Sequence, residues 1–542
     1  MEALLLLTIG LPAAVAAALL VCGLLLGLAG LPALPESVWR GIGLVASIAT
    51  FAITLLVVVP AFDPEQLGLQ LVESVHLAGS AEVHLLFGLD GIGLCFMLST
   101  AGLVPLAMLS VRGGTIESVR AWVLVCLCLE TALLGALAAA SWLAFLLCWS
   151  LGLVPILVWF GCWGGEGRTR AAARLWTVEA IGLAGLLFVA FVLREACRVQ
   201  LGVPTLDLVS LDPAGGATLL DVRIEPDEQR FLLAALGIAL ATRLPIVPFH
   251  FWTPTAHAAA PVGLSMLLAT GFVQTAAIGA LRFALPLFPD AATEAGPLLA
   301  AIGIISLAYA SLVALVQKEL TRLVAYASAA YAGFALFGIS TLNVQGVTGA
   351  VVQLLTHGLA TAGLFVLIGF LARRRETTEV AAFGGLAKPM PVCAFFFGVM
   401  VLSLMGLPLL GGFVGDLFVL LGSLERSREL SIVALIAMVV AASYLLWVQR
   451  RIFLGPVDEP ANRGLIDLDR LERGILLVLT IPIVAIGVYP NPVLRRVEPS
   501  VLEILYQMER RAIGVEEPDP ESAEASEAEV VRSDPFTGES RS

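Results

Sequence analysis

Residues 389–422 read PMPVCAFFFGVMVLSLMGLPLLGGFVGDLFVLLG, an apolar run in which Asp416 is the one charged side chain. A helix needs about 20 residues to cross a hydrocarbon core about 30 Å thick, so this run is too long for one straight crossing. Pro408, Gly411 and Gly412 stand near its middle, where such residues interrupt a helix. The stretch therefore predicts a membrane helix that is broken inside the bilayer.

Apolar runs of this kind recur along the whole chain. Hydrophobic residues make up 59% of the 542 positions and charged residues 14%, which is too little charge to coat a soluble protein of this length. Backbone polar groups must be paired in lipid, and strand-like alternation is absent, so the runs predict helices rather than a barrel. We expect an all-α polytopic membrane protein with about fourteen transmembrane helices. The predicted spans lie near 3–31, 40–61, 85–110, 119–139, 142–163, 173–193, 230–249, 260–285, 296–317, 322–341, 346–372, 389–422, 430–453 and 472–490.

Two of these spans are interrupted, the seventh by Pro245 and Pro248 and the twelfth by Pro408. They stand five spans apart, which predicts two five-helix repeats, each with one broken helix, the second inverted relative to the first. Paired broken helices point to ion sites at the membrane midplane, although Pro and Gly also kink packed helices that hold no site. The predicted divisions are an N-terminal three-helix segment (1–111), the two repeats (119–286 and 296–453), a C-terminal helix with an interfacial segment (470–512) and an acidic, disordered tail (513–542).

Charge predicts the orientation of the chain. The net charge is −12, but the tail beyond Ala512 supplies −7 of it and is too polar to bury a core. If the N-terminus faces outward, the inward connections carry seventeen Lys and Arg and the outward connections seven, among them Arg282. By the positive-inside rule, both termini are expected on the outer side. Met1 and Glu2 supply no basic segment before the first apolar run, so we expect that run to remain as a helix.

Several function classes find no support in the sequence. The eight cysteines are scattered and form no CxxC pair, which argues against a redox centre or a structural metal in this chain. No dinucleotide-binding, Walker or nucleophile pattern occurs in the loops. No basic patch with interleaved aromatic residues suggests nucleic acid. The expected surroundings are the lipid bilayer and other membrane subunits.

Ionisable side chains inside the predicted spans are the candidate functional residues, because they are costly at this depth and usually functional. They are Glu130, Glu179, Arg243, His250, His257, His357 and Asp416. Arg243 stands just before the break in the seventh span, and Asp416 just after the break in the twelfth. His357 lies in mid-span, and an imidazole titrates near neutral pH and can pass a proton.

Each candidate also has a structural interpretation. A histidine inside a membrane protein is often an interhelical hydrogen-bond partner, and His250 and His257 suit anchoring near an interface. Glu130 and Glu179 can each pair with an arginine or a hydroxyl, and we expect one of them to be the partner of Arg243. A further charged group is predicted to form an interfacial ion cluster at a membrane edge, namely Lys318, Glu319 and Arg322.

Residues 241–257, ATRLPIVPFHFWTPTAH, resemble the seventh-helix signature of the antiporter-like membrane subunits of respiratory complex I. The other stretches that resemble this family are ELTRLVAYAS at 319–328, HGL at 357–359 and GFVGD at 412–416. LRFALPLFP at 281–289 and the chain length resemble the subunit M (chain 4) type within it. The resemblance covers roughly residues 85–455.

This resemblance implies a membrane-arm subunit of NADH-quinone oxidoreductase, a translocase, in a bacterial inner membrane, where it helps to couple quinone reduction to outward proton transfer. NADH, FMN, iron–sulfur clusters and quinone would then be bound by partner subunits. It also implies a polar axis along the membrane midplane. The residues of that axis would be a fifth-helix Glu, seventh- and eighth-helix Lys, an eleventh-helix His and a twelfth-helix acid or Lys.

The sequence departs from that axis at several positions. Ser150 replaces the fifth-helix Glu, Arg243 the seventh-helix Lys and Gln274 the eighth-helix Lys, while Asp416 keeps the twelfth-helix acid. Arginine does not deprotonate in proteins, glutamine carries no exchangeable charge, and serine is no acid near neutrality. Two interpretations therefore stand beside the first. One is a subunit of a related assembly, such as a cation/proton antiporter, a membrane hydrogenase or an inorganic-carbon uptake complex; the other is a structural spacer that pumps nothing.

Overall fold

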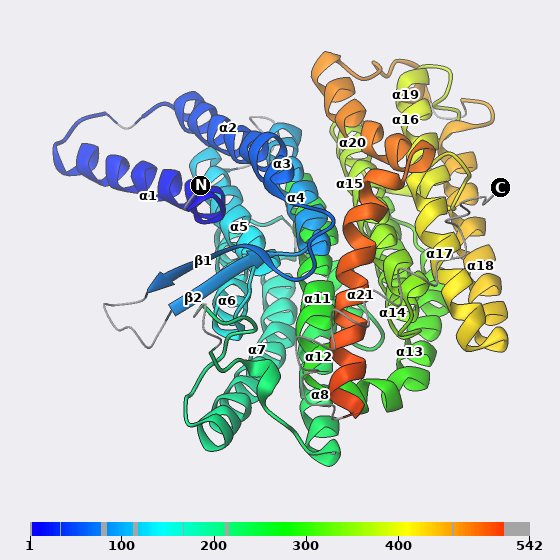
Figure 1. The fold of residues 1–542 in the computed structure, drawn as a ribbon. Helices are drawn as coiled ribbons and strands as arrows, with labels where there is room; N and C mark the ends of the chain where they lie inside the picture. Colours follow the sequence, from blue (N-terminus) through cyan, green and yellow to red (C-terminus); the bar gives the residue numbers. More distant parts are fainter. Residues whose placement is uncertain are drawn as a thin grey trace, which may run out of the picture.

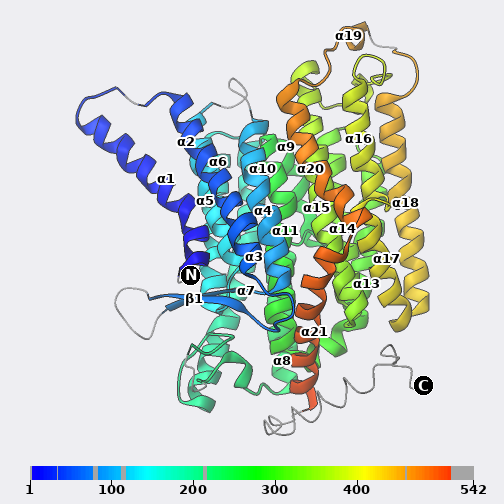
Figure 2. The same ribbon diagram turned by 45° about the horizontal axis from the view of Figure 1, so that its top comes forward.

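Long helices packed into one bundle make up most of the molecule, seen in two orientations of the computed structural model (Figures 1 and 2). The structure describes residues 3–32, 34–76, 84–111, 117–165, 167–211, 216–457 and 460–513. Twelve helices in these ranges are long and apolar enough to cross a membrane. The predicted number of fourteen, and the division into two inverted repeats, stay predictions. The acidic tail predicted for 513–542 lies outside the described residues apart from its first position.

The N-terminal part consists of α1 (Leu4–Leu28), α2 (Glu36–Ile53), η1 (Thr54–Val58), α3 (Val59–Ala61), β1 (Gln70–His76), β2 (His84–Leu89) and α4 (Gly91–Ser110). The next part consists of α5 (Val119–Leu137), α6 (Trp142–Cys162), α7 (Arg168–Leu201), η2 (Leu219–Asp221), α8 (Pro226–Ala241), η3 (Phe249–Trp252), α9 (Thr253–Ala259), α10 (Val262–Leu267), η4 (Leu268–Phe272), α11 (Val273–Ile278), η5 (Gly279–Ala284) and α12 (Leu285–Leu287). Here α10 to α12 form one continuous helix with two π-helical turns. Such turns are rare in proteins, and those that occur often lie at functional sites.

The remaining elements are α13 (Pro289–Leu315), α14 (Leu320–Ile339), α15 (Val344–Arg375), η6 (Val380–Ala382), α16 (Pro391–Leu404), α17 (Gly411–Arg426), α18 (Arg428–Phe453), α19 (Pro460–Arg463), α20 (Arg470–Val488) and α21 (Asn491–Ile513). The most buried of them is α15, whose membrane-crossing window is 100% buried inside the molecule. It packs against α14, α16, α17 and α20 and is the central helix of the second part.

Both predicted breaks are present. Around the seventh predicted span, α8 ends at Ala241 and helical structure resumes at Phe249, so residues 242–248 form the first break. In the twelfth, α16 ends at Leu404 and α17 begins at Gly411. Gly406 lies in this second break with a φ of 70°, a left-handed conformation that favours glycine. We call α8–α9 the first broken segment and α16–α17 the second.

A β-hairpin precedes α4, and the sequence analysis missed it. The predicted third span began near residue 85, but residues 84–89 form β2, and the helix begins only at Gly91. Asp90 fixes that start, because its carboxylate accepts a hydrogen bond of 2.6 Å from the Gly93 amide. Glu73 on β1 accepts hydrogen bonds from the amides of Leu5 and Leu6 at 3.0 and 2.8 Å. The hairpin therefore holds the first turn of α1.

The C-terminal helix α21 lies across elements from several parts of the chain (Figure 1). It packs against α4, α12, α13 and α15. Its approach to α4 is so close that a Cβ at Gly91 would lie 1.7 Å from the Arg496 carbonyl oxygen. The Ser500 hydroxyl accepts a hydrogen bond of 2.8 Å from the Gly91 amide. This helix therefore ties the N-terminal part to both later parts of the bundle.

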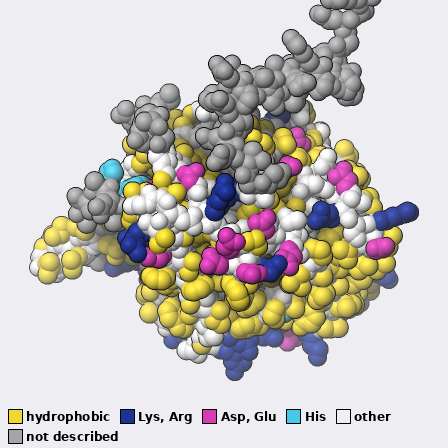
Figure 3. All heavy atoms as spheres, turned by 60° about the horizontal axis from the view of Figure 1, so that its bottom comes forward, with side chains coloured by type: hydrophobic (Ala, Val, Ile, Leu, Met, Phe, Trp, Pro, Cys, Tyr) yellow, Lys and Arg dark blue, Asp and Glu magenta, His cyan; other side chains and the backbone are white. Residues whose placement is uncertain are grey.

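The surface has the layered character of a membrane protein. In Figure 3 a broad hydrophobic band separates a mixed, polar face from a far edge at which Lys and Arg side chains gather. Helices at the rim leave large apolar side chains exposed, including Phe191, Ile436 and Val439, which are 71%, 61% and 61% exposed. Such a band is stable only in contact with lipid or with other membrane subunits.

Candidate functional site

The first broken segment carries a buried ion pair. Arg243, just after α8, donates from Nε to both carboxylate oxygens of Glu179 on α7, at 3.3 and 3.2 Å, and from Nη2 to Oε2 at 3.1 Å. Both side chains are 1% exposed. A buried charge requires a close partner of opposite sign. Glu179 is that partner, and Glu130 is not.

Aromatic rings enclose the guanidinium of Arg243. Its Cζ lies 3.9 Å from the centroid of the Trp149 ring and 4.2 Å from that of Phe272. Its Nη2 also donates to the Trp149 carbonyl oxygen at 2.5 Å. Ring faces attract cations, most strongly where water is excluded. These contacts thus hold the guanidinium in one position.

Two positions at which the sequence departs from the implied axis, Ser150 and Gln274, carry no ionisable group. The Ser150 hydroxyl donates to the Leu146 carbonyl of its own helix at 2.8 Å. Gln274 on α11 accepts hydrogen bonds from the hydroxyls of Ser99 and Thr100 at 3.1 and 3.2 Å. Its Nε2 is buried and has no hydrogen-bond partner among the described residues. These two positions therefore lack the fifth-helix acid and the eighth-helix lysine that the resemblance implied, and Arg243 stands in place of the seventh-helix lysine.

Glu130 is fully buried at a separate place on α5. Its Oε1 accepts a hydrogen bond of 3.0 Å from the Ser47 hydroxyl of α2. Its Oε2 has no partner in the part of the chain that the structure describes. No basic side chain pairs with it among these residues, so the environment favours the neutral acid.

The second broken segment carries a different pair. His357 on α15 lies with Nε2 at 3.2 Å from Oδ1 of Asp416 on α17, and the two side chains are 4% and 5% exposed. The Tyr331 ring covers the imidazole at a centroid distance of 3.9 Å. The Asp416 Oδ2 atom is buried without a hydrogen-bond partner in the described structure. It lies against Gly406, where a Cβ would come within 2.7 Å of it.

The break itself therefore makes room for Asp416. Only glycine combines the left-handed backbone of position 406 with the absence of a Cβ that would meet the carboxylate. The two sites differ in chemistry. Imidazole and carboxyl groups each gain and lose protons, whereas a guanidinium stays protonated. The pair at the second broken segment can therefore exchange a proton, whereas the pair at the first consists of fixed charges.

The sequence of the chain matches a family of known membrane proteins. Residues 139–442 match the protein family described as "NADH:quinone oxidoreductase/Mrp antiporter, TM". The chain belongs to this family. It is 32% identical to NADH-quinone oxidoreductase subunit M of Rhodobacter capsulatus over 86% of this chain and 90% of that protein. It is 30% identical to the same subunit of Rickettsia typhi over 86% and 91%.

Solved structures agree with this assignment. A chain of "Respiratory complex I from Thermus thermophilus with bound NADH" superposes with a TM-score of 0.80 at 28% identity, covering 93% of this chain and 99% of that one. A chain of the Mrp complex from Dietzia superposes with a TM-score of 0.73 at 16% identity, covering 92% and 99%. The second likeness concerns the fold alone. The antiporter-type membrane fold is therefore common to both kinds of complex.

The remaining predicted residues of this family member lie apart from the two pairs. His250 is 8% exposed and makes an edge contact with Tyr309. His257 is 2% exposed and stacks on Phe365 at 4.6 Å. Of the three charges predicted to form an interfacial cluster, the structure pairs two: Arg322 Nε lies 3.0 Å from Glu319 Oε2, with side chains 48% and 36% exposed. Lys318 is exposed beside them.

Sequence reasoning missed one buried ion pair of this family member. Arg282 was counted among the outward loop charges, but it is 5% exposed. Its Nε donates to Asp90 Oδ2 at 3.0 Å, and its Nη1 donates to the carbonyl oxygens of Leu137 and Ala139 at 3.0 and 2.8 Å. The available signal was the aspartate before the α4 run, which reads as a helix N-cap. It did not reveal the arginine.

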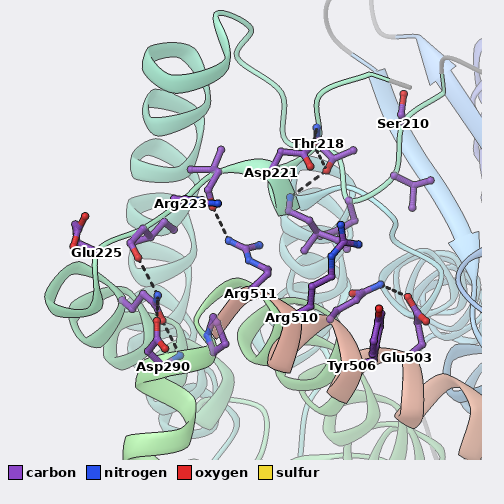
Figure 4. A pocket seen from close by; sticks show the side chains of 18 of the residues that line it. Ser210, Thr218, Asp221, Arg223, Glu225, Asp290, Glu503, Tyr506, Arg510 and Arg511 are labelled. Atoms are coloured by element: carbon purple, nitrogen blue, oxygen red, sulfur yellow. Dashed lines mark hydrogen bonds between the residues drawn. The ribbon is translucent and has the colours of Figure 1, made fainter. Parts of the chain in front are cut away.

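A cavity of considerable size lies away from both pairs. It has a volume of about 820 Å³ and lies between α21 and residues around 208–226 (Figure 4). Arg511 projects into this region and donates from Nη2 to the Val222 carbonyl oxygen at 2.6 Å. Burial lowers the pKa of Arg511 to about 10, and the nearby carboxylates of Asp221 and Asp290 oppose that shift. The arginine stays charged at neutral pH and fastens α21 to this loop.

Proposed function

We propose that the chain is a membrane-arm subunit of a complex I-type NADH:quinone oxidoreductase in a bacterial inner membrane. Its identity to curated subunits named NADH-quinone oxidoreductase subunit M supports this role. NADH, FMN, iron–sulfur clusters and quinone would then bind partner subunits. The excess of Lys and Arg in the connections expected to face inward supports an orientation with both termini on the periplasmic side. The two broken segments support the division into inverted five-helix repeats at 119–286 and 296–453.

Within that role, we propose that the His357–Asp416 pair carries the proton-transfer step of this subunit. One observation carries the proposal, the 3.2 Å contact between imidazole Nε2 and a carboxylate whose second oxygen has no described partner. A proton can pass between Nε2 and Oδ1 along this contact, which gives either a neutral pair or an imidazolium–carboxylate pair. The low polarity of the surroundings makes the balance between these two forms sensitive to a nearby charge.

The Arg243–Glu179 pair takes the opposite role in this proposal. It is neutral as a unit and bears a guanidinium that does not release its proton. We assign it to the assembly of the first broken segment rather than to proton transfer. Glu130, as a buried acid without a cationic partner, remains a candidate for a step in the first half of the subunit.

The test compares two variants of the second pair in the intact complex. Asp416→Asn keeps the shape of the side chain and His357→Gln keeps a polar side chain of similar size, and both remove the group that gains and loses a proton. General acid–base groups contribute about 10²- to 10⁴-fold to a proton-transfer rate, so protons translocated per NADH oxidised should fall clearly in reconstituted vesicles. Thr348→Val is the matched control, since Thr348 is fully buried on the same helix and its hydroxyl has no described partner. Unchanged stoichiometry in both variants, with normal assembly, would refute the proposal.

A second candidate is a spacer that holds its neighbours in place and pumps nothing. The hydrogen bonds of Ser150 and Gln274 to neutral partners favour it. This hypothesis predicts that Asp416→Asn leaves the stoichiometry unchanged while loss of the whole chain abolishes assembly. The proteins that co-purify in mild detergent decide between complex I and a related assembly. NADH-dehydrogenase and quinone-site subunits are expected, and antiporter or hydrogenase subunits in their place would assign the chain to another complex.

A further inference from the structure

A small cavity of about 20 Å³ lies beside His357. Its polar walls come from Ser328 and Tyr331 on α14 and from Gln353, His357 and Thr361 on α15. Ala269 of η4 and Val273 of α11 also line it, and no residue of α17 does. The cavity is therefore on a side of the imidazole other than the one that faces Asp416.

Two polar atoms of the residues that line this cavity are unsatisfied. Gln353 Oε1 and His357 Nδ1 are buried, and neither has a hydrogen-bond partner among the described residues. Gln353 Nε2 donates to the Tyr331 carbonyl oxygen at 3.2 Å, which fixes the orientation of the amide. Residues four apart lie on the same face of a helix, so the Gln353 and His357 side chains stand one above the other along α15.

Buried polar atoms are almost always paired, with protein or with ordered water. A water molecule needs a cavity of at least about 10–15 Å³ and two to four polar partners. This cavity has the volume for one water molecule and offers such partners. A wholly apolar space of the same size would stay dry.

We infer that the cavity binds one ordered water molecule, held by Gln353 Oε1 against Nδ1 of His357. With a proton on Nε2 directed at Asp416, Nδ1 is an acceptor, so the water donates one hydrogen to Nδ1 and one to Oε1. Its oxygen is free to accept from the Ser328 hydroxyl. Gln353 is thus a positioning residue, because it acts on the proton carrier through the water.

The inference rests on the proposed function and gives it a direction. His357 becomes a two-sided carrier with water at Nδ1 and a carboxylate at Nε2. When a hydronium-like donor on the water side gives a proton to Nδ1, the proton on Nε2 passes to Asp416. The imidazole is left neutral with its proton on Nδ1, and rotation or exchange must restore the first tautomer before the next transfer. Proton number and charge balance at each step.

The first test is a structure of the whole complex by electron cryo-microscopy, at a resolution that shows ordered waters elsewhere in the map. A density peak at hydrogen-bond distance, about 3 Å, from both Gln353 Oε1 and His357 Nδ1 is expected. An empty cavity in a map that shows other buried waters would overturn the inference. This result does not depend on any pumping measurement.

Variants of Gln353 provide the second test. Gln353→Met keeps the volume and removes the acceptor, so the peak should disappear and protons per NADH should fall. Gln353→Glu keeps an oxygen at the same place and should retain the peak. Thr348→Val, on the same helix but not at the cavity, should change neither. A water that persists in Gln353→Met would refute the role of Gln353.

The water site and the proton path can be refuted separately. If the peak disappears in Gln353→Met while Asp416→Asn and Gln353→Met both pump normally, the water site stands and the proposed proton path falls. If Asp416→Asn loses pumping but the unaltered cavity is empty, the path stands and the water site falls. If Gln353→Met does not assemble, the map of the unaltered complex decides alone.

Discussion

The Arg243–Glu179 pair allows a double-mutant cycle whose outcome separates a fixed structural pair from a working proton path. The single variants are Arg243→Met and Glu179→Leu, and the third member is the double variant. Each single change leaves one charge at a site that is 1% exposed. The double change leaves none. All three replace the polar side chain with an apolar one of similar length.

The structure sets the expected size of each effect. Arg243→Met removes all three hydrogen bonds that Glu179 accepts from the guanidinium, and stranding one member of a buried pair costs about 3–5 kcal/mol. Two independent losses would add to about 6–10 kcal/mol. Replacing a whole buried pair with apolar residues is often neutral, so the double variant should lie within about 2 kcal/mol of the unaltered protein.

The assay is the rate at which the purified complex loses this chain in mild detergent at fixed temperature, with the amount of chain in membranes as a second readout. Each 1.4 kcal/mol corresponds to a factor of ten, so each single variant should be lost up to about 10²- to 10³-fold faster. The exposed pair Arg230–Glu294, at 2.7 Å and more than half exposed, is the matched control. Its cycle should show less than about 1 kcal/mol of coupling.

Pumping by the double variant completes the test. A fixed pair predicts unchanged protons per NADH once the double variant has assembled. Two results would contradict the assignment of Arg243 and Glu179 as a fixed structural pair. A double variant as labile as the single ones would mean that the pair is not an isolated electrostatic unit. A double variant that assembles normally but loses pumping would show that the Arg243–Glu179 pair belongs to an active path.

Three further outcomes are expected. Gly91→Ala places a Cβ against the Arg496 carbonyl oxygen, so the amides of α21 should exchange hydrogen faster, and unchanged exchange would contradict the observed packing. Arg511→Met leaves the Val222 carbonyl without its charged donor, a loss of about 1.5–3 kcal/mol, so local exchange should rise about 10- to 100-fold in hydrogen-exchange mass spectrometry; a change below twofold would count against the anchor. Protease added to spheroplasts should trim the C-terminal tail, whereas trimming only in inverted vesicles would reverse the predicted orientation.

Features that are local in sequence could be predicted. Helices follow from the length of each apolar run, and both breaks follow from Pro and Gly within such runs. The hairpin did not follow, because β1 and β2 are short and β2 reads as the start of the α4 run. Arg282 did not follow either. From sequence, a charged residue at the end of an apolar run looks the same whether it lies in a loop or is buried. The partner of Arg282, Asp90, lies 192 positions away in the chain.

The choice of partner for Arg243 shows what decides such contacts. Glu179 and Glu130 were equal candidates by sequence, since each is one acid in a predicted span. The structure favours Glu179 because α7 approaches the first broken segment closely at Gly182 and Gly185. A Cβ there would lie 2.7 Å from the Thr242 hydroxyl and 2.8 Å from the Ala235 carbonyl oxygen. The small residues one and two turns after the acid thus bring its carboxylate to the arginine.

This packing helps to explain how a subunit without the implied lysines can keep the fold of the family. The buried core of the first broken segment requires charge neutrality, and Glu179 with Arg243 meets that requirement without any titrating group. A proton path requires the reverse, a group that changes charge with small changes in its surroundings. Among the described residues, the second broken segment supplies this at His357 and Asp416. Charge neutrality at Arg243 and Glu179 and proton exchange at His357 and Asp416 are separable properties. The double variant tests the first and leaves the residues of the second unchanged.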